Sequence, residues 1–153
     1  MTDPFLIHAL LCETILVDER TQSPSYINTL DAITITGKLP EYSPTGISFK
    51  VAACFRAATF AGQASYSVSF HSEGGKPREL SAGDFKIAPN SGANIFIDCK
   101  LQPKNVGMHW IEVRLNGKRC ARLPLELAYT QQSADTSPVA APHRTDSRQK
   151  RRR

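Results

Sequence analysis

Apolar and polar residues alternate one by one through much of this chain, and this alternation is the feature that most limits how it can fold. Apolar side chains occupy every second position in residues 47–55 (ISFKVAACF), 65–71 (SYSVSFH) and 94–101 (NIFIDCKL). Because successive side chains of a β-strand point to opposite faces, each segment predicts a strand with one buried face. No segment carries the sustained period of an amphipathic helix. The pattern therefore predicts an all-β protein.

Further strands are expected between these segments. Residues 5–17 (FLIHALLCETILV) are apolar at both parities, which fits a central strand or a helix, and their β-branched end favours a strand. Residues 27–37 (INTLDAITITG) form one β-branched run, and residues 85–87 predict a short strand. A turn at residues 73–76 (EGGK) is expected to join the strand at residues 65–72 to a strand at residues 78–80 in a hairpin. About eight short strands separated by turns predict an antiparallel, immunoglobulin-like β-sandwich, with a small closed barrel as the alternative.

Asn116 and Gly117 form the strongest turn motif of the chain, within IEVRLNGKRCARLPLEL (residues 111–127). Both residues tolerate the positive φ of a type I′ turn, so we expect a two-residue β-hairpin. A loop of this length fixes the register of the two strands. The residues predicted to face each other are Leu115 and Lys118, Arg114 and Arg119, Val113 and Cys120, and Ile111 and Arg122.

This register contains a conflict, because it would bury Arg122 and turn the three leucines that follow it outward. A bulge near Ala121 and Arg122 would reverse the alternation and return the leucines to the core. Pro124 has no N–H to donate to a neighbouring strand, so it belongs at an edge or at the bulge itself. We therefore expect the second strand of the hairpin to be an edge strand with an irregularity in its middle.

The C-terminal part differs in composition from the rest of the chain. Residues 130–153 (TQQSADTSPVAAPHRTDSRQKRRR) contain almost no large apolar side chain, so they cannot bury enough surface to offset the entropy of ordering. We predict a β-sandwich domain at residues 1–129 and a disordered basic tail at residues 130–153. Six basic and two acidic residues give the tail +4 of the net charge of +5, which leaves +1 for residues 1–129. The basic character therefore belongs to the tail.

The cysteines and the N-terminus bear on the cellular compartment. The four cysteines form no CxxC pair, and residues 1–13 (MTDPFLIHALLCE) lack the basic segment of a secretory signal. The apolar run in this stretch is far too short to span a bilayer. We therefore expect reduced thiols, a cytoplasmic location and no membrane span.

Two motifs near the ends of the expected domain resemble a bacterial domain family of unknown function. They are ALLCE (9–13) followed by LDAI (30–33), and GMHWIEVRLNGKRCARLPLEL (107–127). In that family a glycine opens the last hairpin, an aromatic residue follows shortly after it, and a proline-containing apolar strand closes the domain. The resemblance spans about residues 5–128, is weak in the middle and excludes the basic tail. It implies a small, soluble, bacterial all-β domain with no assigned activity and no catalytic residues.

Candidates for catalysis and metal binding are few. The chain contains no GxSxG motif. Its cysteines could meet His8, His71 or His109 in three dimensions, but their spacing singles out no pair, and a cysteine on an apolar face usually behaves as a small buried hydrophobe. His8 and Cys12 would lie about 13 Å apart along a strand and could share a metal only on a helix. We predict no catalytic residue, metal or cofactor, with an enzyme site assembled from distant loops as a remaining alternative.

The last hairpin offers a surface for a protein partner. Trp110 lies at the opposite parity to Ile111, so it could pack across the hairpin or contact a partner. The facing arginines at positions 114 and 119 repel each other unless Glu112 or Glu126 compensates them, or else an acidic partner or a phosphate. The predicted partner contacts are Trp110, Arg114, Lys118, Arg119 and Arg122.

The tail offers a second surface, because five of its last six residues are basic. A flexible arm of this charge attracts nucleic acid or anionic lipid without specificity. The candidate residues are Arg148, Lys150, Arg151, Arg152 and Arg153. We therefore expect a non-enzymatic interaction or accessory module, with a nucleic-acid-associated protein tethered through its tail as the alternative.

Overall fold

Nine β-strands make up the computed structural model, which describes residues 3–37, 46–102 and 105–131. The strands are β1 (Phe5–Val17), β2 (Pro24–Thr29), β3 (Ala32–Gly37), β4 (Ile47–Arg56), β5 (Gly62–Ser72), β6 (Arg78–Ile87), β7 (Gly92–Leu101), β8 (Gly107–Leu115) and β9 (Lys118–Gln131). No helix long and apolar enough to cross a bilayer occurs within the described residues. The prediction of an all-β protein is confirmed, with nine strands where about eight are expected.

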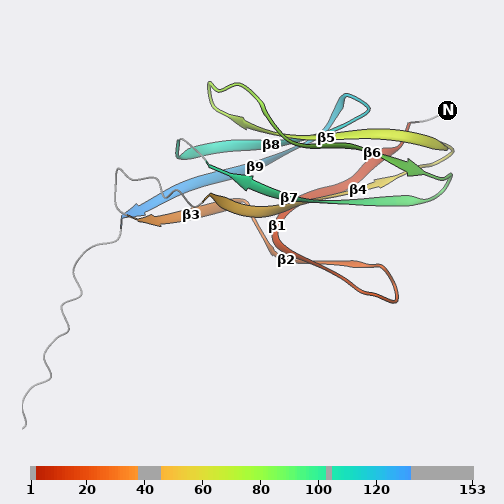
Figure 1. Cartoon of the computed structure of the whole chain (residues 1–153), viewed down its shortest axis with the longest axis horizontal. Coiled ribbons are helices and arrows are strands. Elements are labelled where there is room, and N and C mark those ends of the chain that lie inside the picture. Colours follow the sequence, from red (N-terminus) through yellow and green to blue (C-terminus); the bar gives the residue numbers. More distant parts are fainter. Residues whose placement is uncertain (1–2, 38–45, 103–104, 132–153) are drawn as a thin grey trace, which may run out of the picture.

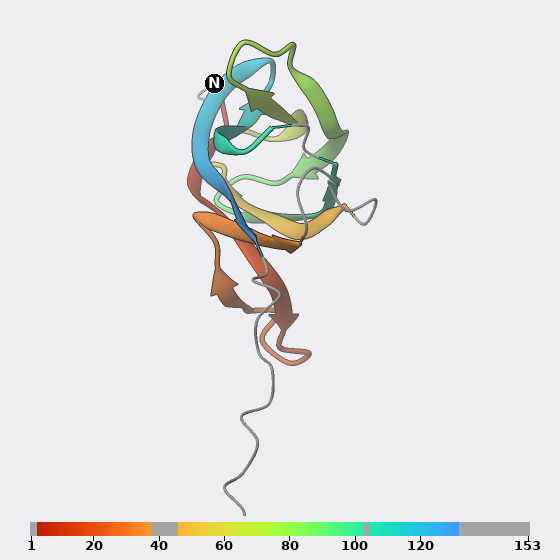
Figure 2. The ribbon, with the colours of Figure 1, turned by 90° about the vertical axis from the view of Figure 1, so that its left-hand side faces the viewer.

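The strands form two sheets that lie one over the other (Figure 1). The four-stranded sheet has the order β2-β1-β4-β7 and is antiparallel throughout. The five-stranded sheet has the order β3-β9-β8-β5-β6 and is strongly curled (Figure 2). Its strand β3 runs parallel to β9, so the prediction of a wholly antiparallel architecture is wrong for this strand.

The parallel strand arises where the chain leaves one sheet for the other. Residues 27–37, predicted as one strand, are divided between β2 and β3. Between them, the N–H of Leu30 donates to the carbonyl of Leu11 in β1, and the carbonyl of Asp31 accepts from Glu126 in β9, both at 2.8 Å. Adjacent residues are thus hydrogen-bonded to different sheets. Asn28, just before the crossing, adopts a positive φ of 52°.

The alternating apolar faces of the two sheets enclose one core. Phe55 of β4 stacks on Phe85 of β6 with 5.5 Å between the ring centroids, which is a contact between the sheets. The predicted strands at residues 5–17, 47–55, 65–71 and 94–101 are confirmed as β1, β4, β5 and β7, whereas the segments 78–80 and 85–87 belong to one strand, β6. The largest fully buried side chains are Phe55, Leu101, Ile111, Leu125, Leu127, Val51, Val68, Val113 and Cys12.

One hairpin extends beyond this core. β1 pairs with β4 only as far as Cys12, and from there to Val17 it pairs with β2 alone. The β1–β2 hairpin therefore projects from the body of the molecule (Figure 2). Its side chains include Leu16, which is 55% exposed.

The turn of the β8–β9 hairpin matches its prediction. Asn116 and Gly117 adopt φ angles of 49° and 76°, as a type I′ turn requires. Leu115 pairs with Lys118, and Arg114 pairs with Arg119. The two-residue loop and the first two predicted pairs are therefore confirmed.

The predicted bulge is present, but it lies nearer the turn. The register shifts directly after the pair of arginines, so Cys120 is the extra residue. The predicted pairing of Val113 with Cys120 and of Ile111 with Arg122 is therefore wrong. The observed pairs are Val113 with Ala121, Glu112 with Arg122, and Ile111 with Leu123. The shift keeps Arg122 exposed and buries Leu125 and Leu127.

β9 lies between β8 and β3 in its sheet, with β8 paired to it as far as Leu127. β3 pairs with it from Glu126 to Gln131, so the prediction of an edge strand is wrong for this part. Pro124 lies just before it, where only β8 is paired with β9, and its missing N–H costs no hydrogen bond to β3. β9 ends at Gln131, two residues beyond the predicted domain boundary, and the rest of the predicted tail, 132–153, lies outside the described residues.

Replacing Leu125 by alanine should lower the free energy of unfolding by about 2–5 kcal/mol, because it opens a cavity in the core. Leu16→Ala is the matched control at an exposed leucine, and it should change the stability by less than about 0.5 kcal/mol. Urea unfolding followed by circular dichroism measures both values. Equal destabilisation by the two substitutions would contradict this placement of the core.

Candidate interaction surface

The face of the five-stranded sheet that points away from the core gathers polar side chains from β5, β8 and β9. Alternation along β8 buries Ile111 and Val113 on the core side and directs their neighbours to the opposite side. Across the strands, Ser69 pairs with Glu112 and His71 with Trp110. We call this set the outer-face cluster, and its members are Ser69, His71, Trp110, Glu112, Arg114, Arg119 and Arg122.

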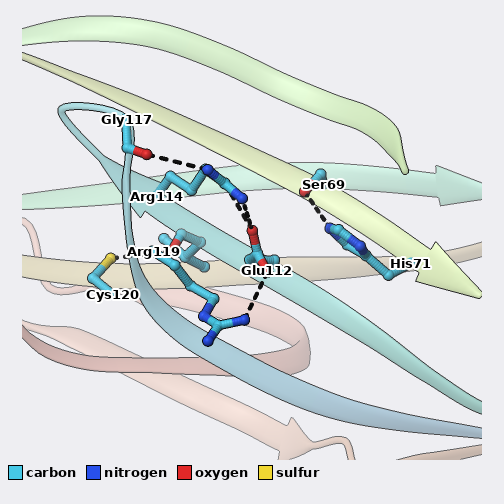
Figure 3. Close-up of polar contacts among 8 residues, drawn as sticks. Ser69, His71, Glu112, Arg114, Gly117, Arg119 and Cys120 are labelled. Atoms are coloured by element: carbon cyan, nitrogen blue, oxygen red, sulfur yellow. Dashed lines mark hydrogen bonds and ion pairs between the residues drawn. The ribbon is translucent and has the colours of Figure 1, made fainter. Parts of the chain in front are cut away.

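Glu112 is the buried centre of the cluster, with 4% of its surface exposed. Nε of Arg114 donates to its Oε1 at 2.7 Å, and Nη1 of Arg119 lies 3.6 Å from its Oε2 (Figure 3). Burial by itself raises the pKa of Glu112, but the hydrogen bond from Arg114 and the charges of Arg114, His71 and Arg119 outweigh it and hold the pKa below its usual value. Glu112 therefore compensates the two facing arginines, as the sequence predicts.

Glu126, the other residue expected to compensate the arginines, does not take this role. Its side chain forms no ion pair with any described residue. It lies opposite Met108, far along the hairpin from the turn. Glu112 alone lies close enough, because it is two residues from Arg114 on the same face of β8.

Trp110 and Arg122 meet at one end of the cluster. The guanidinium carbon of Arg122 lies 4.3 Å from the centroid of the Trp110 ring, which is a cation–π contact. Beside them is a hollow of about 450 Å³ lined by His71, Ser72, Glu73, Gly74, Met108, Trp110 and Arg122. Met108 is 43% exposed. We call this feature the Trp110 hollow.

The five predicted partner contacts separate into three groups. Trp110 and Arg122 lie together at the Trp110 hollow, and the two arginines at 114 and 119 bind Glu112. Lys118 lies at the turn of the hairpin, with its Nζ 3.6 Å from Oδ2 of Asp3. The predicted nucleic-acid contacts of the tail, residues 148–153, lie outside the described residues.

The sequence prediction omits Met108 and His71, although both line the Trp110 hollow. Met108 is two residues from Trp110 and so lies on the same face of β8, which the alternation already indicates. His71 reaches the hollow because β5 lies beside β8 in the sheet. No local sequence pattern specifies that neighbourhood.

Ser69 and His71 form a hydroxyl–imidazole pair, with 2.9 Å between Oγ and Nε2 (Figure 3). A catalytic serine also requires a carboxylate that orients the imidazole through its other nitrogen. Glu112 is nearby, but its oxygens are held by the arginines, and no hydrogen bond joins it to His71. Ser69 and His71 therefore do not form a triad with Glu112 in the described part of the chain.

The four cysteines are all free thiols in the described residues. Burial, assisted by the charge of Asp98, raises the pKa of Cys99 to about 11, and burial also raises the pKa of Cys12 and Cys120. A raised pKa keeps a thiol protonated and poorly nucleophilic.

His8 bonds through Nε2 to the hydroxyl of Tyr26 at 2.9 Å. No group of three or more histidine, cysteine or acidic side chains in the described part is arranged to hold a metal ion.

Comparison with known proteins shows similarity of fold alone. No family model matches this chain, and no curated protein is similar to it. Among solved structures, the Pseudomonas fluorescens alkylpurine DNA glycosylase AlkC, bound to DNA containing an abasic site analog, superimposes with a TM-score of 0.50 at 14% identity over 83% of this chain. A β-glucosidase from Listeria innocua gives a TM-score of 0.49 at 9% identity over 79% of it. The chain spans 31% of the glycosylase and 16% of the glucosidase.

Glu112→Gln should destabilise the protein at pH 7 by about 1–2 kcal/mol, because it removes a charge-assisted hydrogen bond and leaves the two arginines facing each other. Since the pKa of Glu112 is lowered in the folded state, its contribution is present above the ordinary carboxyl pKa and is lost as the pH falls through the lowered value. The deficit of the variant should therefore shrink below about pH 4.

The matched control for this experiment is Glu126→Gln, on the same hairpin but without an ion pair to a described residue. Urea unfolding of both variants between pH 3 and pH 7 makes the comparison. We expect the control to follow the wild type within about 0.5 kcal/mol at every pH. An equal effect of the two substitutions would show that Glu112 does not hold the hairpin charges.

Proposed function

We propose that the protein is a non-enzymatic interaction module of the bacterial cytoplasm, built as an immunoglobulin-like β-sandwich, and that it binds a protein partner at the Trp110 hollow. The observation that carries this proposal is the stacking of Arg122 on Trp110 at the rim of a hollow that also exposes Met108. Tryptophan, methionine and arginine are enriched at protein interfaces, and tryptophan and arginine are frequent hot-spot residues.

The position of Trp110 in the sheet supports this assignment. β8 has β9 on one side and β5 on the other, so the indole is carried by a strand that is hydrogen-bonded along both edges. The guanidinium of Arg122 covers one face of the ring. A contact surface that is already ordered loses little conformational entropy when a partner binds.

The charges around the hollow indicate the chemistry of the partner. Arg114 and Arg119 are compensated by Glu112, whereas Arg122 forms no ion pair with a described residue. The complementary surface would place a carboxylate against Arg122 and an apolar side chain against Met108 and Trp110. Such a partner would be a protein segment in which an acidic residue lies next to an apolar one.

Trp110→Ala and Arg122→Gln test the proposal in affinity capture with the full-length chain, read by quantitative mass spectrometry. We expect one set of proteins that the wild type enriches and that both variants lose by about tenfold or more, since hot-spot truncations cost about 2 kcal/mol or more. The control is Arg56→Gln, an exposed arginine at the end of β4 in the other sheet, which should retain the set. If no protein distinguishes the hollow variants from the control, the proposed docking site is wrong.

A second candidate function rests on the charge of the C-terminal segment. Residues 130–153 carry +4, and Arg148, Lys150, Arg151, Arg152 and Arg153 are concentrated at its end. We propose as the alternative that this segment tethers the domain to nucleic acid by phosphate contacts, which need no base-specific side chains. The similarity to AlkC, which is bound to DNA in that structure, concerns the fold and adds nothing to this charge argument.

Removal of residues 144–153 tests this alternative. The full-length chain should bind duplex DNA with an affinity that falls steeply between 50 and 200 mM salt, roughly as the number of phosphate contacts predicts. The truncated chain should lose that binding, whereas Trp110→Ala in the full-length chain should retain it. Fluorescence anisotropy with a labelled duplex measures the DNA affinity of all three proteins. Equal binding by the full-length and truncated chains would exclude a tether in the tail.

A further inference from the structure

Two hollows adjoin each other where the edge strands β6 and β7 of the two sheets lie side by side. One, of about 430 Å³, is lined by Phe70, the turn residues 72–76, Arg78, Leu101, Gln102, Asn105 and His109. The other, of about 500 Å³, is lined by Gly46, Ser48, Arg78, Lys100, Leu101 and Gln102. Because they share Arg78, Leu101 and Gln102, they form one depression, which we call the basic groove. The groove adjoins the Trp110 hollow at Ser72, Glu73 and Gly74, but Trp110, Met108 and Arg122 do not line it.

The groove brings together cations from both sheets. Lys76 and Arg78 come from the β5–β6 connection and the start of β6, and Lys100 comes from the end of β7. None of the three forms an ion pair with a described residue, whereas Lys50, also in the four-stranded sheet, is paired with Asp98. Glu73 is the acidic residue among the described lining. Among the described lining residues, three cations and one carboxylate give a net charge of +2.

A buried histidine, His109, also belongs to the wall of the groove. His109 is 3% exposed, and its ring stacks on that of Phe70 with 5.0 Å between the centroids. Its Nε2 donates to the carbonyl of Asn105 at 3.0 Å, since a carbonyl can only accept. Its Nδ1 has no hydrogen-bond partner among the described residues. Buried polar atoms are nearly always hydrogen-bonded in folded proteins, so His109 is a lining residue with an unsatisfied polar atom behind the wall of the groove.

We propose that the basic groove binds a small organic phosphate monoester. A phosphate monoester carries about −1.5 to −2 charges at neutral pH, which matches the net charge of the groove. Arg78 lies at the junction of the two hollows and presents the planar donor fork that binds phosphate oxygens in pairs, with Lys76 and Lys100 on either side. The organic part has Phe70 and Leu101 as its apolar contacts.

The test is a titration of the ¹⁵N-labelled full-length chain with glucose 6-phosphate, followed by two-dimensional NMR. A site-resolved reading is needed because the basic C-terminal residues attract any anion without making a site. We expect saturable shifts of the amides of Gly75, Arg78 and Leu101, which line the groove but not the Trp110 hollow. Inorganic phosphate should shift the same amides more weakly, and unphosphorylated glucose should leave them in place.

Arg78→Gln should weaken this binding by about tenfold or more, because a charge-assisted hydrogen bond is removed. Lys86→Gln is the matched control, since Lys86 is an exposed cation of the same strand that lines neither hollow. The affinity of Lys86→Gln for glucose 6-phosphate should stay within about twofold of the wild-type value. Trp110→Ala should also stay within this range, which would distinguish the groove from the proposed docking surface. A groove that shows no saturable shifts, or equal losses in Arg78→Gln and Lys86→Gln, would overturn the proposal. The spectrum of each variant without ligand shows whether it is folded.

Discussion

Exclusion of water between the two sheets is the constraint on which the rest of the structure depends. Either sheet alone would leave a whole apolar face in water, because a strand directs every second side chain to the same side. Val51 of β4 and Val113 of β8 are both fully buried and mark the middle of the two faces. The polar side chains are consequently left on the outer faces and along the sheet edges, where the Trp110 hollow and the basic groove lie.

Local sequence patterns are sufficient to predict those parts of the fold that depend on residues close together in the sequence. The alternation in β4, β5 and β7 and the turn at Asn116 and Gly117 are such parts. The pairing of β3 with β9 cannot be predicted in this way, because it depends on the crossing at Leu30 and Asp31, which contact strands remote in sequence. The leucines of β9 show that the strand needs a bulge, but the sequence does not predict that the bulge lies at Cys120. A register shift at any nearby residue would turn the leucines to the core equally well.

The same distinction applies to the candidate sites. The compensation of the facing arginines by Glu112 follows from the register of one hairpin. The contact of Arg122 with Trp110 depends on the bulge, because the unshifted register would place Arg122 opposite Ile111 on the core face. The shift places it opposite Glu112, on the face that carries the indole. The basic groove joins β6 and β7, which belong to different sheets, so pairing rules within one sheet cannot predict it.

Native-state hydrogen exchange at the inner strands β4 and β8 tests the common core most directly, because one strand belongs to each sheet. The slowest amides of both strands should exchange only through global unfolding and should therefore show the same protection free energy. Amides of the projecting β1–β2 hairpin, such as that of Leu16, should exchange much faster. Protection of one inner strand well below that of the other would show that the two sheets open separately, which contradicts a single core.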